Sequence, residues 1–334
     1  MALNLCPSRL QLLPVSPEKT LVGNLRKSLP SLTPSQNLTG RRNPQLRRFG
    51  NGGRAPIGRA VKEEQTQIDG AVETGAVEID LPSSKLVLVV GGTGGVGQLI
   101  VASLLRRNIK SHLLLRDPAK AKSLFGDLDE NISKIWKGDT RYPHDLDPAI
   151  FEGVTHAICC TGTTAFPSRR WHGENTPEKV DWEGVRNLVS ALPKTLKRFV
   201  LVSSVGVTKC DELPWSLMNL FGVLKFKKMA EDIVHKSGIP FTIIRAGRLT
   251  DGPYTSYDLN TLLQATAGKR RAVVIGQGDK LVGEASRLVV AEACIQTLDI
   301  DFTRGKIYEI NSVEGEGPGN DPEKWKELFK AAES

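Results

Sequence analysis

Alternation between short apolar runs and stretches of helical periodicity is the feature that most constrains the fold of this chain. From Lys85 onward, most of the apolar runs are apolar at successive positions, as strands buried on both faces of a parallel sheet are. The segments between them carry apolar residues at helical spacing. The pattern predicts an α/β fold with a doubly wound, mainly parallel sheet and helices on both faces. The expected strands are residues 85–90, 111–116, 132–137, 155–160, 198–203, 240–245, 272–275 and 306–310.

A glycine-rich turn follows the first of these runs directly. The stretch VLVVGGTGGVGQLI places Gly91, Gly94 and Gly97 between an expected strand and an expected helix. Glycines permit a tight turn and let the backbone approach a pyrophosphate, whose charge is met by free amides and by the positive end of the helix dipole. Three spaced glycines alone are weak evidence, but the strand before and the helix after strengthen it. The sequence therefore predicts a Rossmann-type NAD(P)-binding domain over residues 85–334, with a small C-terminal extension on the substrate side; an ordinary glycine-rich turn is the alternative.

Arg116 stands at the end of the second expected strand. Proteins that select NAD place an acidic residue there, against the ribose 2′-hydroxyl, whereas a guanidinium suits a 2′-phosphate. Asp117 precedes Pro118, which is typical of a helix N-cap followed by the first helical position. We therefore expect NADP(H) to be favoured over NAD(H), with Lys120 as a second positive contact. The alternative is a solvated Arg116 paired with Asp117.

The ends of two further expected strands carry residues that could contact the same cofactor. Asp139, in KGDTRY, is placed to accept a hydrogen bond from an adenine amino group, or Gly138-Asp139 is only a turn. Thr161 and Gly162 follow the fourth expected strand, where small residues suit a backbone that approaches the middle of the cofactor.

The first 60 residues differ in composition from the rest of the chain. They contain ten Lys or Arg, one acidic residue and many prolines, which predicts a disordered plastid transit peptide over residues 1–60. A basic arm that binds nucleic acid is the alternative. Residues 61–84 are acidic and small, as in a linker. The remaining 35 basic and 36 acidic residues leave the body near neutral, so we expect no nucleic-acid partner there.

Other classes of protein are disfavoured by what the chain lacks. No run approaches the roughly 18 apolar residues that span a bilayer, which is compatible with a soluble or peripheral protein. The five cysteines form no CxxC pair, so we expect no metal site and no disulfide framework. We expect a chloroplast protein, in the stroma or peripheral to the thylakoid or envelope. A protein partner in the plastid is compatible with the sequence, which does not identify one.

Several motifs, taken in the order in which they occur along the chain, resemble those of the atypical short-chain dehydrogenase/reductase family, in its NmrA-like, NAD(P)-binding branch. The resemblance covers about residues 85–312. This part of the chain is similar to plant plastid members of the family, such as the dehydrogenase-like subunit of the Tic complex. The motifs are GGTGGVG, LLRDPAK, GDT, VDWEGVRNL, RFVLVSSVGV, KKMAED, GIPFTIIRAGRLTDGP and EASRLVVAEAC.

The resemblance implies roles for individual residues. It implies a pyrophosphate cradle at Gly91, Thr93, Gly94, Gly95, Val96 and Gly97, a 2′-phosphate contact at Arg116 and an adenine contact at Asp139. The family's catalytic serine corresponds to Ser203-Ser204, of which we take Ser204, and its ribose-binding lysine corresponds to Lys228.

One position departs from the family pattern. Reductases of this kind have a tyrosine four residues before the lysine, and its hydroxyl passes a proton to the substrate oxygen during hydride transfer. Here that position holds Leu224, and none of the four tyrosines stands four residues before a lysine. Leucine has no titratable proton, and loss of a general acid lowers a rate by about 10²–10⁴-fold.

The missing tyrosine favours a redox-sensing or binding role with weak or no reductase activity. The alternative is an NADPH-dependent reductase of a small carbonyl or enone substrate with a different proton donor. The candidate donors, each also explicable as a loop or core residue, are Tyr254, Tyr257, His172 and Cys160.

Overall fold

The computed structural model describes residues 85–249 and 271–333 of the 334-residue chain. The predicted transit peptide and linker lie outside the described residues, and so do Tyr254 and Tyr257. Within the described residues, no helix is both long enough and apolar enough to cross a membrane.

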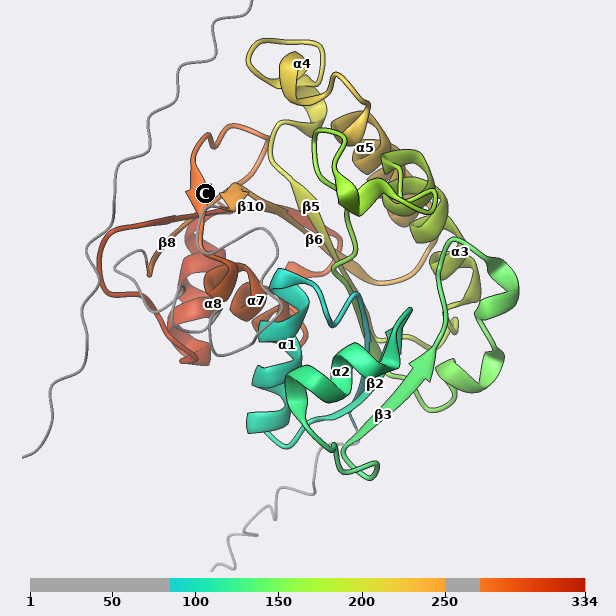
Figure 1. The fold of residues 1–334 in the computed structure, drawn as a ribbon. Coiled ribbons are helices and arrows are strands. Elements are labelled where there is room, and N and C mark those ends of the chain that lie inside the picture. The colour runs from blue at the N-terminus through green and yellow to red at the C-terminus, as the bar shows by residue number, and fades with distance from the viewer. Residues whose placement is uncertain (1–84, 250–270, 334) are drawn as a thin grey trace, which may run out of the picture. The chain divides into compact units, whose positions relative to one another are not determined.

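An eight-stranded sheet forms the centre of the described fold (Figure 1). Neighbouring strands run parallel, except that β8 is antiparallel to β10. The eight predicted runs are these eight strands, so the doubly wound, mainly parallel sheet is confirmed. In spatial order the strands are β3 (Ser133–Lys137), β2 (Lys110–Leu115), β1 (Leu86–Val90), β4 (His156–Cys159), β5 (Arg198–Ser204), β6 (Phe241–Ala246), β10 (Lys306–Val313) and β8 (Ala272–Gly276).

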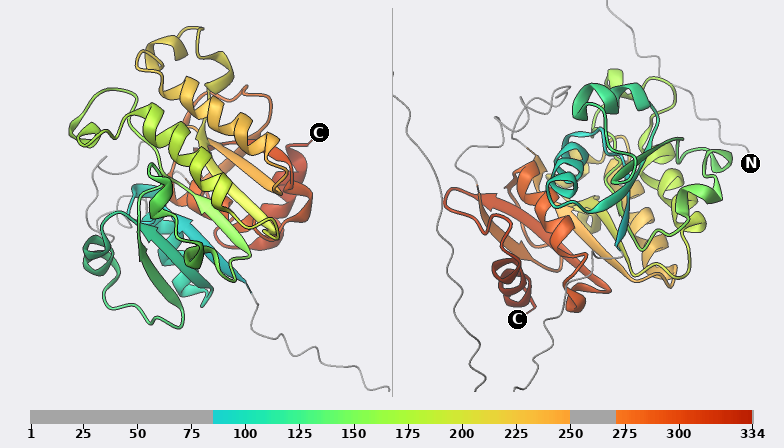
Figure 2. Two further views of the ribbon diagram at one scale, coloured as in Figure 1. Left: turned by 90° about the vertical axis from the view of Figure 1, so that its right-hand side faces the viewer. Right: turned by 90° about the horizontal axis from the view of Figure 1, so that it is seen from below.

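Helices cover both faces of the sheet, and alternate residues of each strand meet them. Val87 and Val89 of β1 share one core with α1 (Gly95–Arg106), α7 (Arg287–Gln296) and α8 (Pro322–Ala331). Leu88 and Val90 share the other core with α3 (Gly184–Ala191) and α5 (Val223–Lys236). The left view of Figure 2 shows α3 and α5 side by side across that second face. Because both faces are covered, the strands are apolar at successive positions, which is the pattern seen in the sequence.

Shorter elements complete the described fold. Helix α2 (Pro118–Phe125) follows β2 and begins at the predicted cap, because the Asp117 side chain accepts hydrogen bonds from the amides of Ala119 and Lys120. Helix α4 (Trp215–Met218) lies in the connection from β5 to α5, and a second, two-stranded sheet pairs β7 (Arg248–Leu249) with β9 (Glu284–Ala285).

The order of the strands determines where a ligand can bind. From β1 the chain moves outward to β2 and β3, and then returns to β4 on the other side of β1. In open α/β sheets, ligands bind outside the carboxyl ends of the strands at such a reversal. The connections that leave β1, β2, β3, β4 and β5 at that edge therefore define the candidate site.

Candidate functional site

The turn between β1 and α1 brings the backbone of the helix close to the end of the strand. Gly91 has a φ of +89°, and its carbonyl accepts a hydrogen bond of 2.9 Å from the amide of Gly94. A Cβ atom on Gly97 would lie 2.1 Å from the Gly91 oxygen, and one on Gly91 would lie 2.9 Å from the amide nitrogen of Thr161. Only glycine fits at both places, so the turn lies flat against the end of β4.

The first turn of α1 points its amides toward this edge. The helix begins at Gly95 after an extended, solvent-exposed Gly94, and no side chain caps it. The first amides of a helix lack intrahelical partners and carry the positive end of its dipole. Thr93 stabilises the turn from the other side, because its carbonyl accepts a 3.0 Å hydrogen bond from the Gln98 side chain. This geometry can bind an anion through backbone groups.

A second guanidinium lies beside the same turn, which the sequence analysis did not identify. Arg287 is the first residue of α7 and is buried. A Cβ atom on Gly95 would come within 2.8 Å of its Nε atom, so the glycine leaves space that the arginine fills. Its sequence signal was weak because Gly95 and Arg287 are 192 positions apart and only the packing of α1 on α7 brings them together.

Arg116 and Asp139 lie close together at the ends of β2 and β3. Arg116 is exposed and donates a hydrogen bond to the side chain of Asn175. Arg141 donates to Asp139 from Nη2 at 2.7 Å and from Nε at 3.0 Å, and its amide also binds that carboxylate. Burial acts to raise the pKa of Asp139, but the bonds from Arg141 outweigh it, and the pKa lies below its ordinary value. The edge therefore carries Arg116, Arg141, the ionised Asp139 carboxylate that is already paired, and the Asp145 carboxylate, which accepts a 3.0 Å hydrogen bond from the Asp139 amide.

A buried ion pair occupies the middle of the crevice. Lys227 of α5 lies 2.7 Å from the Asp181 carboxylate, whose side chain is fully buried. The other Asp181 oxygen accepts hydrogen bonds from the amide and hydroxyl of Thr163. A Cβ atom on Gly162 would lie 3.1 Å from the Lys227 Nζ, so the glycine admits the ammonium. The small pocket at this point is lined by Thr161, Asp181, Val185, Leu201, Val202, Ser203, Lys227 and Ala230.

The structure does not bring Lys228 to this pocket. Its ammonium pairs with Asp232 one turn further along α5, and both side chains are partly exposed. Leu224, at the family's tyrosine position, is buried in an apolar cluster with Val207 and Val223. The residue of α5 that faces the crevice is thus Lys227, one position before the lysine expected from the sequence.

The two serines at the end of β5 have different surroundings. Ser204 is partly exposed and donates a 3.0 Å hydrogen bond to the carbonyl of Val205. Ser203 is buried and donates to Glu231 of α5 at 2.6 Å.

Ser203 belongs to a buried polar network that the sequence analysis missed. Glu231 accepts two hydrogen bonds from Arg245 of β6, at 2.7 and 3.0 Å. The same guanidinium lies 3.8 Å from Asp279, which in turn accepts from the amide and hydroxyl of Thr208. The network joins β5, β6, α5 and the turn after β8, and so fixes the start of the connection that leaves β5. Its members are distant in sequence, so no local spacing reveals them.

The predicted substitute proton donors that the structure describes are poorly placed. Cys160 donates its thiol to the Val90 carbonyl, and burial raises its pKa well above the ordinary value. His172 is exposed. The two described tyrosines, Tyr308 and Tyr142, were not among the predicted donors. Tyr308 is buried under α8, and burial together with the Glu333 carboxylate raises its pKa. Tyr142 stacks on His144 in the turn after β3 and is not among the residues that line the Lys227 pocket.

The fold and the turn after β1 define a Rossmann-type nucleotide-binding protein. A family described as "NAD(P)H-binding" matches residues 91–301, which is most of the described fold. The chain belongs to this NAD(P)H-binding family, which confirms the family resemblance drawn from the sequence motifs.

Individual relatives agree with this assignment. The chain is 33% identical to an uncharacterized chloroplastic protein of Arabidopsis thaliana, over 75% of this chain and 81% of the relative. It is 30% identical to sanguinarine reductase of Eschscholzia californica, over 74% and 96%. It is 28% identical to the chloroplastic protein TIC 62 of Pisum sativum, over 74% of this chain and 47% of that longer protein. A putative NAD-dependent epimerase/dehydratase from Bacillus halodurans has the same fold, with a TM-score of 0.55 at 20% identity, covering 74% of this chain and 99% of that one.

Proposed function

We propose that this chain is a plastid NADP(H)-binding protein whose main role is to bind the nucleotide, as a redox sensor or as a platform for a protein partner, with weak or no reductase activity. The observation that carries the proposal is the close contact between Gly91, Gly97 and the end of β4. Side chains at those glycines would strike the backbone of the turn and of Thr161, so glycine keeps the turn tight and leaves the first amides of α1 open to a pyrophosphate. Gly91, Thr93, Gly94, Gly95, Val96 and Gly97 would hold the pyrophosphate.

The charge at the ends of β2 and β3 supports NADP(H) over NAD(H). Arg116 is exposed beside Asn175, and the neighbouring Asp139 is neutralised by Arg141. A carboxylate that is already paired repels a 2′-phosphate less than a free one does, while a planar guanidinium can bind it through two hydrogen bonds. In this arrangement Asp139 would meet the adenine through its remaining acceptor capacity.

At the reactive end, Lys227 takes the role that the sequence assigned to Lys228. Its ammonium lies beside Thr161 and Gly162, at the carboxyl end of β4, where the nicotinamide ribose of such a cofactor would lie. Asp181 holds the ammonium in place. No described tyrosine lies at this pocket, and Leu224 is packed into apolar surroundings, which supports the binding role.

The ion pair also favours a second candidate, an NADPH-dependent reductase of a small carbonyl or enone. When bound, NADPH would supply a hydride to a substrate carbon. The substrate oxygen must then receive a proton, and Lys227 carries a transferable proton at Nζ, held 2.7 Å from Asp181. Ser204 would orient that oxygen. The relative named as a reductase supports this alternative.

A turnover screen separates the two candidates. The purified protein is mixed with NADPH and a panel of aldehydes, quinones and enones, and NADPH consumption is followed against Lys227→Ala. The binding role predicts no consumption above the variant. Turnover at ordinary enzyme rates of about 1 s⁻¹ or more, abolished in Lys227→Ala, would establish the reductase instead.

The proposed plastid location is supported by the basic composition of the first 60 residues and by relatives whose names include "chloroplastic". Import by isolated chloroplasts with removal of about 60 residues is the expected result. Retention of the full-length chain outside the organelle would refute it.

A further inference from the structure

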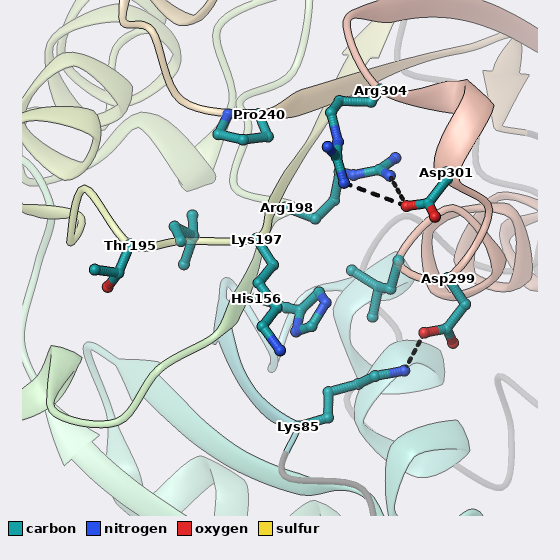
Figure 3. Close-up of a pocket in the computed structure, with 11 residues that line it drawn as sticks. Lys85, His156, Thr195, Lys197, Arg198, Pro240, Asp299, Asp301 and Arg304 are labelled. Carbon is teal, nitrogen blue, oxygen red and sulfur yellow. Dashed lines mark hydrogen bonds and ion pairs between the residues drawn. The ribbon is translucent and has the colours of Figure 1, made fainter.

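A second cavity lies at the opposite edge of the sheet from the crevice, where the parallel strands begin. It has a volume of about 540 Å³, within the range of sites for small-molecule ligands. Figure 3 shows side chains from several chain segments turned toward this one space. We call it the basal cavity, and it is lined by Lys85, His156, Thr195, Leu196, Lys197, Arg198, Pro240, Leu298, Asp299, Asp301 and Arg304.

The basal cavity is separate from the nucleotide site. His156 and Arg198 are the first residues of β4 and β5, and Lys85 directly precedes β1. The glycine turn and Thr161 follow the last residues of β1 and β4. A strand of five residues is roughly 16 Å long, so the two sites lie at opposite ends of the strands, with the buried sheet between them.

Arg198 is the observation that points to a ligand. Its side chain is 2% exposed, and its Nε atom is buried without a hydrogen-bond partner among the described residues. Nη1 donates to the hydroxyls of Thr242 and Thr303, which are neutral. The nearest carboxylate recorded for it, Asp301, is 3.9 Å away. A buried cation with neutral partners is costly unless an anion compensates its charge.

The available carboxylates do not supply that compensation. Asp301 is largely exposed and is shared with Arg304 at 3.2 Å, as the two dashed lines in Figure 3 show. Asp299 is paired with Lys85. Lys197 is exposed and has no recorded ion-pair partner among the described residues. Four basic side chains therefore face two acidic ones around the cavity.

At neutral pH, His156 adds neither a negative charge nor a further cation to the cavity. Burial, and then the positive charge of Lys85, lower its pKa to about 4. Its Nδ1 is 2.8 Å from the Thr155 hydroxyl. The ring is thus a neutral polar group in a cavity with net positive charge.

We propose that the basal cavity binds a small molecule that carries a phosphate or carboxylate group, attracted by the positive charge of Arg198, Arg304 and Lys197 in its lining. Arginine forks and a lysine together suit such a group, because charge-assisted hydrogen bonds to oxyanions are the strong ones. The site does not depend on the nucleotide, so it stands whether or not the chain binds NADP(H).

Thermal unfolding with added anions tests the site. The full chain is titrated with inorganic phosphate, and separately with citrate, at constant ionic strength set with sodium chloride and with NADPH present to occupy the glycine turn. Either anion should raise the Tm, since a ligand that binds only the folded state stabilises it. The anion that acts identifies whether phosphate or carboxylate is the preferred group.

Two charge reversals locate the effect. Lys197→Glu alters an exposed residue of the cavity rim, so folding should be preserved, and the apparent Kd for the anion should weaken by about tenfold or more. Lys324→Glu, on the surface of α8 and outside the cavity, should leave the Kd unchanged. Absence of stabilisation by both anions, or equal stabilisation of the wild type and Lys197→Glu, would overturn the proposal.

Discussion

Replacing Lys227 with alanine should lower the free energy of unfolding far more than the same change at Lys228, its neighbour on α5. The two lysines differ in position by about 100° around the helix. Lys227 neutralises Asp181, whose side chain is fully buried, whereas Lys228 pairs with the half-exposed Asp232. Lys228→Ala is therefore a matched control of identical chemistry.

The expected magnitudes follow from burial. Breaking a buried ion pair leaves an uncompensated charge and typically destabilises by about 3–5 kcal/mol. The Lys227 side chain is 15% exposed, and Thr163 continues to donate to Asp181, so we expect the lower end, about 3 kcal/mol. An exposed pair contributes about 0–1 kcal/mol, which sets the expectation for Lys228→Ala. Urea unfolding without nucleotide measures both.

A double variant separates stability from nucleotide contact. Asp181→Asn combined with Lys227→Met removes both charges, so most of the lost stability should return. The cation beside the nicotinamide ribose is still absent, so NADPH should bind more weakly than to the wild type. Equal destabilisation by Lys227→Ala and Lys228→Ala, or normal NADPH affinity in the double variant, would refute the assignment of Lys227.

Three further changes have expected outcomes. Gly97→Ala forces a Cβ atom to 2.1 Å from a backbone oxygen, so it should destabilise by about 2 kcal/mol or more and abolish NADPH binding. Gly238→Ala, where a Cβ meets no atom but φ is +73°, should destabilise by about 1 kcal/mol and keep binding; calorimetry decides. The pKa of His156 is about 4 in the fold and 6.5 when unfolded, so the unfolded state binds the extra proton between these values, and stability should fall by roughly 3 kcal/mol as the pH drops from 6.5 to 4. His156→Gln should reduce the dependence of the free energy of unfolding on pH between these values, measured by urea titration at each pH. An unchanged pH dependence would show that His156 is not its cause. Leu224→Tyr should destabilise by about 1–3 kcal/mol through overpacking and should not increase NADPH consumption, because this position faces an apolar cluster.

The strands and the glycine turn could be predicted because their signals are local. A buried parallel strand must be apolar at successive positions, and the contact of Gly97 with Gly91 requires glycine at both ends of a short turn. Arg116 was placed at the edge of the sheet by the same reasoning, since it follows β2 directly.

The structure brings Lys227 of α5, and not Lys228, to the pocket at Asp181, and the family spacing alone could not show this difference. Val223, Leu224, Ala230, Glu231 and Val234 form the buried face of α5, and Lys227 and Lys228 lie one turn after Val223 and Leu224, respectively. Helical spacing therefore allows either lysine beside the buried face, and only the contact of Lys227 with Asp181 distinguishes them. The partners of Arg245 and Arg198 likewise come from distant segments, and only the folded chain shows them.

Calorimetric titration of the full chain with NADPH and with NADH tests the central claim most directly. The account predicts that NADPH binds at least about tenfold more tightly, because Arg116 adds a charge-assisted contact to the 2′-phosphate, and that Arg116→Ala removes most of this preference. Binding of neither nucleotide, or a preference that is the same in wild type and Arg116→Ala, would contradict it.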